Sequence, residues 1–303
     1  MTLLGIDIGG TKSAAVIGDA EGSVLARVSA LTPQASWQEA YALLCDLVRQ
    51  VCRECQISLT EITAIGVSCG GPLDSKTGVV HAPPNLPLWV DVPLRSLLEA
   101  EFGLPVVLEN DANATALAEH RWGAGQGCAD MAFLTMGTGV GAGLILGGQL
   151  YRGRRDLAGE IGHATVLPGG PLCLCGKRGC LEALASGTSI GRMGRERSGE
   201  DGLTAHDVCA RARLGDPVAL SVIADAALYM GIGLANLLQT LNLERIVLGT
   251  LAVHAADLLM EPIRAAAEAY CWPRVWDGVS IIPAALGDSA QDKAALAVAL
   301  LQK

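Results

Sequence analysis

The sequence predicts an α/β protein of two lobes with a cleft between them. Half of its 303 residues are hydrophobic but only 4% are aromatic, so the core must be aliphatic, as in folds whose buried parallel strands read as short apolar runs. Strand and helix patterns alternate along the chain. A strand running into a glycine turn occurs at the start and again at residues 131–141, which indicates an internal duplication of element order.

The first half of the chain opens with three strands in meander order. An amphipathic helix with Ser36 as its N-cap follows them. Strands and helices then alternate. The expected strands are Leu3–Ile8, Ser13–Gly18, Val24–Ser29, Ile62–Ser68 and Val106–Glu109, and the expected helices are Ser36–Gln56, Val92–Phe102 and Ala112–Trp122.

The second half repeats this order. The expected strands are Met131–Met136, Leu144–Leu146, Arg245–Leu248 and Ser280–Pro283, and the expected helices are Leu181–Glu196, Val218–Leu241, Asp257–Tyr270 and Ala290–Leu301. The helix at 218–241 is apolar nearly all round, so we expect it to be buried. We expect a small N-terminal lobe over residues 1–117 and a large C-terminal lobe over residues 118–289, with the final helix, about residues 290–303, packing back on the first lobe.

One stretch raises the alternative of a membrane span. Residues 133–151 carry no charge, but six of these nineteen residues are glycine. The glycines divide the stretch into turn-sized pieces, so a strand, a glycine turn and a second strand fit it better than a spanning helix. We expect no membrane partner.

Charge and cysteine content narrow the choice of partners and compartment. A net charge of −9 argues against nucleic acid as a partner, but not against a nucleotide, because local backbone amides hold phosphates. The start MTLLGIDIGG reads as a strand rather than a signal peptide, so we expect a reducing cytoplasm, in which the ten cysteines form no disulfides. Cys52 and Cys55 form a C-x-x-C pair, whose helical context favours core packing over redox chemistry.

A cluster of metal-ligand residues stands in the segment 159–182. His163 is followed by Cys173, Cys175 and Cys180 among glycines and prolines. One imidazole and three thiols are the composition of a closed, tetrahedral structural zinc site. A redox pair of Cys173 and Cys175, or inert buried thiols, are the alternatives. Two carboxylates, Glu160 and Glu182, flank the cluster, and we expect them to face a ligand rich in hydroxyls.

Two glycine turns are candidate phosphate loops. The first follows Asp7 at a strand end, where glycines can adopt positive φ and allow a phosphate close to the backbone. Asp7 would then face Mg²⁺ through water, with a plain hairpin turn as the alternative. The second turn, at 137–139, could clamp a polyphosphate from the other side with the hydroxyls of Thr11 and Thr138, or could be only a glycine-rich hairpin.

A polar triplet, Glu109, Asn110 and Asp111, ends one strand just before a helix. The carboxyl ends of strands are where α/β folds place their ligands. Asp111 is therefore either the N-cap of that helix or a base that accepts a proton from an attacking hydroxyl.

These motifs together resemble one family over nearly the whole chain. DIGGTK, ENDANA, LTMGTGVGAGLI and GEIGH followed by C-x-C-G-x-x-G-C-L-E are similar to the ROK family of sugar kinases and related repressors. The resemblance implies the actin-like, hexokinase-like ATPase fold of two α/β lobes with an interlobe cleft. It also implies phosphorylation of hexoses or N-acetylhexosamines with ATP and Mg²⁺, and a homodimer or homotetramer.

The resemblance also implies a role for each motif. Asp111 resembles the general base. The sugar contacts implied are Gly71, Asn110, Asp111, Glu160, His163 and Glu182. The structural zinc ligands implied are His163, Cys173, Cys175 and Cys180, so His163 would bind metal with one ring nitrogen and face the sugar with the other. The nucleotide contacts implied are Asp7, Gly9, Gly10, Thr11, Lys12, Gly137, Thr138, Gly139 and Gly249.

Two departures from the family pattern stand out. The adenosine turn usually carries two or three glycines, but here it reads Gly249-Thr250-Leu251. A β-branched residue disfavours positive φ, so a narrowed or altered nucleotide pocket is expected. The sugar-side loop reads Cys69-Gly70-Gly71-Pro72 where the family often has a proline before Gly-Pro, which leaves hexose selectivity open.

The implied activity is phosphorylation of glucose to glucose 6-phosphate. Kinases of N-acetylmannosamine, N-acetylglucosamine, fructose or allose are alternatives within the family. From another class, a non-catalytic sugar-sensing regulator would carry a helix-turn-helix before the kinase-like core, whereas here DIGGTK already begins at Asp7. A zinc-organised interaction protein is a third alternative, which an intact Asp111 and two phosphate turns disfavour.

Overall fold

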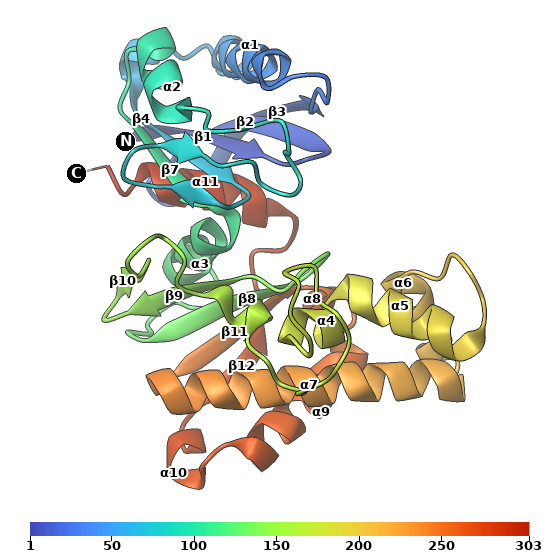
Figure 1. Cartoon of the computed structure of the whole chain (residues 1–303). Helices are drawn as coiled ribbons and strands as arrows, with labels where there is room; N and C mark the ends of the chain where they lie inside the picture. The colour runs from blue at the N-terminus through green and yellow to red at the C-terminus, as the bar shows by residue number, and fades with distance from the viewer. Residues whose placement is uncertain (303) are drawn as a thin grey trace. The chain divides into compact units, whose positions relative to one another are not determined.

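The structure, a computed structural model, describes residues 1–302 (Figure 1). These residues form two compact units. Unit 1 comprises residues 1–126, 150–158 and the segment from 286 onward, and unit 2 comprises residues 127–149 and 159–285. Unit 1 runs past the expected residue 117 because helix α3 (Asp111–Trp122) continues to Trp122, and Glu119 on it accepts the N–H of Leu286 at 3.1 Å.

Unit 1 is built on a five-stranded sheet in the order β3-β2-β1-β4-β7. Its strands are β1 (Thr2–Ile8), β2 (Lys12–Asp19), β3 (Val24–Leu31), β4 (Ile62–Cys69) and β7 (Val106–Asn110). The first three pair antiparallel, which confirms the expected meander, whereas β1–β4 and β4–β7 are parallel. A small hairpin of β5 (Leu73–Asp74) and β6 (Val79–Val80) stands apart from this sheet.

Helices cover both faces of the unit 1 sheet. They are α1 (Trp37–Cys55), α2 (Leu94–Phe102), α3 and α11 (Ala290–Ala299), with single turns η1 (Leu59–Glu61) and η3 (Gly287–Ser289). Because side chains alternate along a strand, Leu4 of β1 joins the core with Leu44 of α1, while its neighbour Leu3 packs with Leu296 of α11. Figure 1 shows the red α11 against the blue strands, far from them in sequence.

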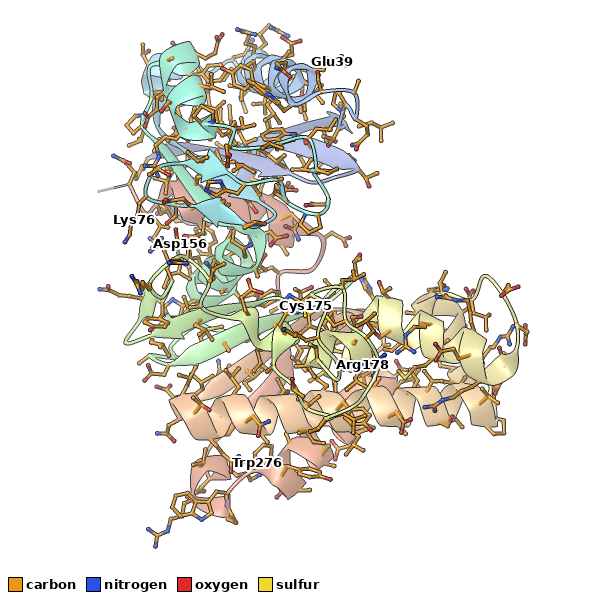
Figure 2. The ribbon with its side chains drawn as sticks, in the orientation of Figure 1. Glu39, Lys76, Asp156, Cys175, Arg178 and Trp276 are labelled. Atoms are coloured by element: carbon orange, nitrogen blue, oxygen red, sulfur yellow. The ribbon has the colours of Figure 1, made fainter. Side chains whose placement is uncertain are left out.

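Local signals explain two helix starts in unit 1. Ser36 caps α1 as expected, because its side chain accepts the N–H of Glu39 at 3.2 Å, and the exposed Glu39 side chain points outward (Figure 2). Helix α2 begins at Leu94 rather than at Val92, since a residue that precedes a proline avoids helical backbone.

The C-x-x-C pair lies on α1. Cys52 is buried and Cys55 half-buried, and both are free thiols. Burial raises the pKa of both thiols, so neither is an activated thiolate. This agrees with the expected core packing.

Unit 2 repeats the strand order of unit 1. Its strands are β8 (Met131–Met136), β9 (Ala142–Leu146), β10 (Gln149–Leu150), β11 (Arg245–Thr250) and β12 (Ser280–Pro283). They form a sheet in the order β10-β9-β8-β11-β12, with β8–β9 antiparallel and β8–β11 and β11–β12 parallel. In each unit the five strands therefore lie in the order third, second, first, fourth, fifth, which confirms the expected duplication.

The helices of unit 2 differ from expectation, because α6, α8 and α10 were not expected and one expected helix is divided in two. They are α4 (Leu181–Ala185), α5 (Gly187–Ser198), α6 (Ala205–Arg213), α7 (Pro217–Leu241), α8 (Leu251–His254), α9 (Ala256–Tyr270) and α10 (Pro273–Trp276), with one turn η2 (Glu160–His163). The single helix expected over Leu181–Glu196 is wrong. Ser186 adopts extended backbone and caps α5 by accepting the N–H of Ser189 at 3.1 Å.

Helix α7 is the expected long apolar helix. By length and composition alone it could cross a membrane, but 56% of its most apolar window is buried within the protein. It packs along α9 and also against α4 and α6, and Figure 1 shows it in orange across unit 2. These contacts confirm a core helix.

Candidate active site

The first glycine turn joins β1 to β2 in unit 1. The N–H of Gly9 donates to the carbonyl of Lys12 at 3.1 Å and closes the turn. Neither Gly9 nor Gly10 has a positive φ, so the conformational reason given for these glycines is wrong. Space is the reason instead, because a Cβ on Gly10 would lie 2.6 Å from the carbonyl oxygen of Asn85. Thr11 and Lys12 are exposed beside them.

Asp7 stands near the end of β1, opposite Ser68 of β4. Burial, together with the nearby carboxylates of Asp111 and Asp292, raises the pKa of Asp7 to about 7, although Arg27 acts in the opposite direction. Arg27 is itself paired with Asp292 at 2.9 Å. Asp7 and Asp111 are thus close enough to repel one another, and a hydrated divalent cation would relieve that repulsion. The residues present therefore fit Mg²⁺.

The Asn110–Asp111 turn lies at the carboxyl end of β7. The side-chain oxygen of Asn110 accepts the N–H groups of Ala112 (2.9 Å) and Asn113 (3.4 Å), so Asn110 is the N-cap of α3. The alternative that Asp111 is this cap is wrong. Asp111 is the first residue of the helix, exposed, with one carboxylate oxygen accepting the N–H of Ala112 at 2.8 Å. Gly71 lies against the amide nitrogen of Asn110, 2.8 Å from where a Cβ would stand.

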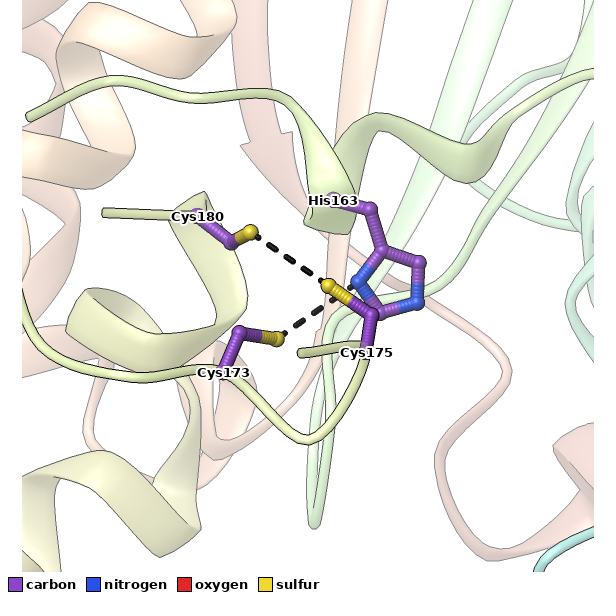
Figure 3. Close-up of side chains that lie close together, drawn as sticks. All are labelled: His163, Cys173, Cys175 and Cys180. Atoms are coloured by element: carbon purple, nitrogen blue, oxygen red, sulfur yellow. Dashed lines mark hydrogen bonds between the residues drawn. The ribbon is translucent and has the colours of Figure 1, made fainter. Parts of the chain in front are cut away.

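The histidine and three cysteines come together in unit 2 (Figure 3). Their ligand atoms all lie within 4.8 Å of one another. The Sγ of Cys173 is 3.7 Å from Nδ1 of His163, and the Sγ atoms of Cys175 and Cys180 are 3.6 Å apart. A tetrahedron with metal–sulfur bonds of about 2.3 Å has edges of about 3.8 Å. The four side chains therefore form a cluster that can hold a metal ion, and their chemistry fits zinc.

Different environments act on the thiols of this cluster. Burial raises the pKa of Cys173 to about 12, whereas the backbone N–H of Lys177 lowers the pKa of the exposed Cys175. Without a metal the thiols would thus release their protons at different pH, and a bound cation would favour the thiolate form of all three.

The two flanking carboxylates contact different residues of the cluster. Nδ1 of His163 faces Cys173, while Nε2 is 3.8 Å from a carboxylate oxygen of the exposed Glu160. Glu182 places Oε1 3.6 Å from Sγ of Cys173, and its Oε2 accepts the N–H of Val140 at 3.0 Å. One metal would therefore fix the orientation of all three candidate sugar contacts of unit 2.

The second glycine turn, at residues 137–139, is held by its own backbone, by Gly187 and by Glu182. The N–H of Gly137 donates to the carbonyl of Gly139 at 3.0 Å, and the carbonyl of Gly137 accepts the N–H of Gly187 at 2.8 Å. Gly139 lies directly against the carboxylate of Glu182. The turn thus connects the metal cluster on one side to the start of α5 on the other.

A cavity of about 450 Å³ opens beside this turn, entirely within unit 2. Such a volume suits a small-molecule ligand. Its walls come from β8, α5, α6 and the segment after β11. They are formed by Met136, Gly137, Thr138, Gly187, Thr188, Gly191, Arg195, Thr204, Ala205, His206, Thr250, Leu251 and His254.

The turn after β11 shows how the missing glycine is accommodated. Thr250 has φ 54° and ψ −116°, a region that β-branched residues rarely adopt. Its hydroxyl accepts the N–H of Met136 at 2.7 Å and donates to the carbonyl of Gly249 at 2.8 Å. Thr250, which stands where the family usually has a glycine, therefore changes the wall of the cavity without closing it. Gly249 itself faces inward, because a Cβ there would lie 2.7 Å from the ring of Phe133.

Most of the cavity residues were missed at the sequence level. Arg195 lies on α5, which the hydrophobic pattern did not separate from α4. His206 lies on α6 and His254 on α8, and the pattern predicted neither of these helices. One local signal was available, because Ser186 followed by Gly187 is a helix start inside the predicted long helix.

Comparison with known proteins shows similarity to one family. The sequence model of the ROK family matches residues 3–302. A glucokinase from Halalkalibacterium halodurans is 42% identical over 247 residues, 77% of this chain and 74% of the relative. A xylose repressor from Bacillus spizizenii is 29% identical over 287 residues, 95% of this chain and 74% of the repressor.

Two solved structures cover nearly the whole chain. The crystal structure of a ROK hexokinase from Thermus thermophilus matches with a TM-score of 0.90 at 38% identity, covering 100% of this chain and 99% of that one. A ROK family glucokinase from Streptomyces griseus, in complex with glucose and AMPPNP, matches with a TM-score of 0.83 at 34% identity, covering 99% of this chain and 100% of that one.

Proposed function

Because this chain belongs to the ROK family and has the actin-like, hexokinase-like ATPase fold of two α/β lobes, we propose that it phosphorylates glucose. The γ-phosphoryl group of ATP would pass to a sugar hydroxyl, giving glucose 6-phosphate and ADP. The observation that carries this proposal is the similarity to glucokinases in a chain that also has the exposed Asp111, both glycine turns and four residues that could hold a metal ion.

Asp111 is the proposed general base. Phosphoryl transfer depends mainly on positioning and charge stabilisation, with one carboxylate orienting the nucleophile and accepting its proton. Asp111 is exposed at the start of α3, where its carboxylate accepts the N–H of Ala112 at 2.8 Å and Asn110 caps the helix, so a ligand hydroxyl would reach it from the solvent. The amide nitrogen of Asn110 and the backbone of Gly71 would contact the same sugar.

The two glycine turns and the unit 2 cavity would hold the nucleotide. Backbone N–H groups in tight turns favour anions, and Thr11, Lys12 and Thr138 add hydroxyl and ammonium donors to them. The nucleoside would occupy the cavity lined by Thr250 and Leu251. Mg²⁺, when bound, neutralises phosphate charge, and Asp7 would hold its hydration shell. Gly9, Gly10, Gly137, Gly139 and Gly249 are the glycines of this proposed nucleotide site.

The metal of the cluster is proposed to be structural zinc. Four protein ligands fill a tetrahedral shell and leave no open position for chemistry. The role of His163, Cys173, Cys175 and Cys180 is then to hold Glu160, the free edge of His163 and Glu182 against the sugar. We further infer a cytoplasmic enzyme that acts as a homodimer or homotetramer on ATP and free sugar.

Two other functions are testable rivals. Kinases of N-acetylmannosamine, N-acetylglucosamine, fructose or allose share the same motifs. A sugar-sensing regulator is the rival from another class, and similarity to a xylose repressor is what favours it. It would bind sugar without consuming ATP.

A coupled ADP-release assay across hexoses and acetamido sugars tests the proposal. Glucose should give the highest kcat/KM, with release dependent on Mg²⁺. A higher value for an acetamido sugar would change the substrate but keep the reaction. Sugar binding in calorimetry without ADP release for any sugar would identify a regulator and refute the kinase.

A further inference from the structure

One short segment of unit 1 comes from the middle of the unit 2 sequence. Residues 150–158, here called the strap, follow the first section of unit 2 and lead directly into Gly159 and Glu160, yet they pack with unit 1. The N–H of Ala158 donates to the carbonyl of Arg152 at 3.0 Å, which closes the strap on itself. None of its residues was singled out by the sequence motifs.

Arg152 of the strap reaches the turn that carries the proposed base. Its Nε donates to Oε2 of Glu109 at 2.6 Å, and the Glu109 side chain is completely buried. The other oxygen of Glu109 accepts the side-chain amide of Asn113 at 2.9 Å and the backbone N–H of Asn110 at 3.1 Å. One carboxylate therefore ties the strap to the residue that immediately precedes Asp111 in the chain.

A second contact ties the strap to the other sugar-side loop of unit 1. The carboxylate of Asp156 accepts the backbone N–H of Ser75 at 2.7 Å. Ser75 follows Gly71 in the loop that also carries Lys76, and Figure 2 labels Lys76 and Asp156 on these two segments, which line one cavity of about 450 Å³. Asp156 has φ 56°, an unfavourable backbone conformation that its contact with Ser75 helps to hold.

The two loops reached by the strap also touch each other. Cys69 pairs with Asn110 where β4 and β7 end, and Gly71 lies against the Asn110 amide. A buried ion pair gives little net stability compared with well-packed apolar side chains. The pair of Arg152 and Glu109 is therefore better explained by the geometry it imposes than by the stability it provides.

We propose that the strap is the positioning element of the sugar side of unit 1. Arg152 acts through Glu109 on the Asn110–Asp111 turn, and Asp156 acts through Ser75 on the loop after Gly71. Both are positioning residues, since neither needs to touch the sugar. The inference rests on the proposed function.

Steady-state kinetics on strap variants tests it. Arg152→Met removes the charge and keeps the length of the side chain. We expect kcat/KM for glucose to fall about tenfold to a hundredfold, as for other small displacements of a reacting group, while KM for ATP stays unchanged. Arg152→Lys restores part of the loss because it restores the charge without the planar donor geometry.

Arg154→Met is the matched control on the same strap. Among residues 1–302 the structure records no ion pair for Arg154, so this variant should match the wild type. Asp156→Gly gives a second, independent test, because glycine accepts the left-handed backbone and only the carboxylate contact is lost. It should raise KM for glucose and leave KM for ATP unchanged.

Several outcomes decide the inference. Wild-type glucose kinetics in both Arg152→Met and Asp156→Gly, or an equal loss in Arg154→Met, would overturn it. If Arg152→Met does not fold, the double variant Glu109→Gln/Arg152→Met removes the unpaired buried charge, and a normal KM for glucose in it would also overturn the inference. If the wild type itself turns over no sugar, the proposed function fails instead, and glucose affinity by calorimetry decides the role of the strap.

Discussion

Units 1 and 2 share one strand order but present different chemistry at their loops. In each unit a glycine turn follows the first strand of the sheet. Unit 1 adds carboxylates near its strand ends, with Asp7 on β1 and Asp111 directly after β7. Unit 2 carries four residues that could hold a metal ion between β10 and β11, and a ligand-sized cavity lined by β8, α5, α6 and the segment after β11. The shared sheet therefore fixes where the loops of a unit converge, while the residues of each loop decide what they do.

If unit 1 supplies the base, the largest effect should come from Asp111. We expect Asp111→Asn and Asp111→Ala to lower kcat about 10²- to 10⁴-fold, the range for loss of a general base, with glucose still bound in calorimetry. Asp46→Ala, at an exposed carboxylate on α1, is the control. Retention of more than a few per cent of the wild-type rate would remove Asp111 from its role.

If unit 2 acts through its metal, the next largest effect should come from Cys175→Ser. A missing ligand should abolish stoichiometric zinc in elemental analysis and lower activity by about tenfold or more, because misplaced metal-site residues commonly cost that much. Cys55→Ser, a half-buried thiol on α1, should keep both zinc and activity. A zinc-free but fully active Cys175→Ser enzyme would contradict the structural role.

A smaller effect is expected from substitutions of Thr250, which should change KM for ATP but not KM for glucose. Thr250→Val keeps the shape but leaves the N–H of Met136 without its hydroxyl acceptor, a loss of about 1 kcal/mol in the stability of this wall of the cavity. We expect KM for ATP to rise by at most about fivefold, the factor to which about 1 kcal/mol corresponds. Thr250→Ser keeps the hydroxyl and should keep KM near the wild-type value. Thr250→Gly should raise KM but also raise Tm, because it relieves a backbone cost of about 1–3 kcal/mol.

Both KM for ATP and Tm must be measured for the Thr250 variants. A merely structural residue would change stability and activity in the same direction. If Thr250→Val leaves KM for ATP unchanged, or raises KM for glucose instead, the threonine does not position the nucleotide side of unit 2.

The smallest effect concerns the pH dependence of unit 1. The pKa of Asp7 is raised from 3.8 to about 7. Its protonated form therefore favours folding, and this contribution is lost as the pH rises from about 4 through about 7. Asp7→Asn cannot ionise, so without added Mg²⁺ its Tm should exceed that of the wild type by a few degrees more at pH 8 than at pH 5. A pH-independent difference would show that burial does not raise this pKa.

Motifs local in sequence were predicted better than contacts between distant segments. The four residues proposed as metal ligands span 163–180, and their ligand atoms come together as expected. The alternative that Asp111 caps the helix was wrong, because its polar neighbour Asn110 can cap as well and only the start of α3 decides between them. The pair of Arg152 and Glu109 is separated by 43 positions, and no spacing rule connects residues so far apart.

The break between α4 and α5 at Ser186 also depends on a contact between segments that are distant in the sequence. Residues 181–196 carry a helical pattern, yet the chain turns at Ser186 because this residue caps a new helix whose first residue, Gly187, hydrogen-bonds to Gly137. That distant contact positions α5 as a wall of the cavity. The hydrophobic periodicity of the sequence therefore could not predict this cavity. The two glycine turns proposed to bind phosphates were predicted, because each is a local sequence motif.

Phosphorus-31 NMR of the purified protein with ATP, Mg²⁺ and glucose would show phosphoryl transfer itself. We expect the γ-phosphate signal to be replaced by that of glucose 6-phosphate, and the Asp111→Asn variant to show no such transfer on the same timescale. Unchanged ATP with every hexose and acetamido sugar, or equal transfer by wild type and Asp111→Asn, would contradict this expectation.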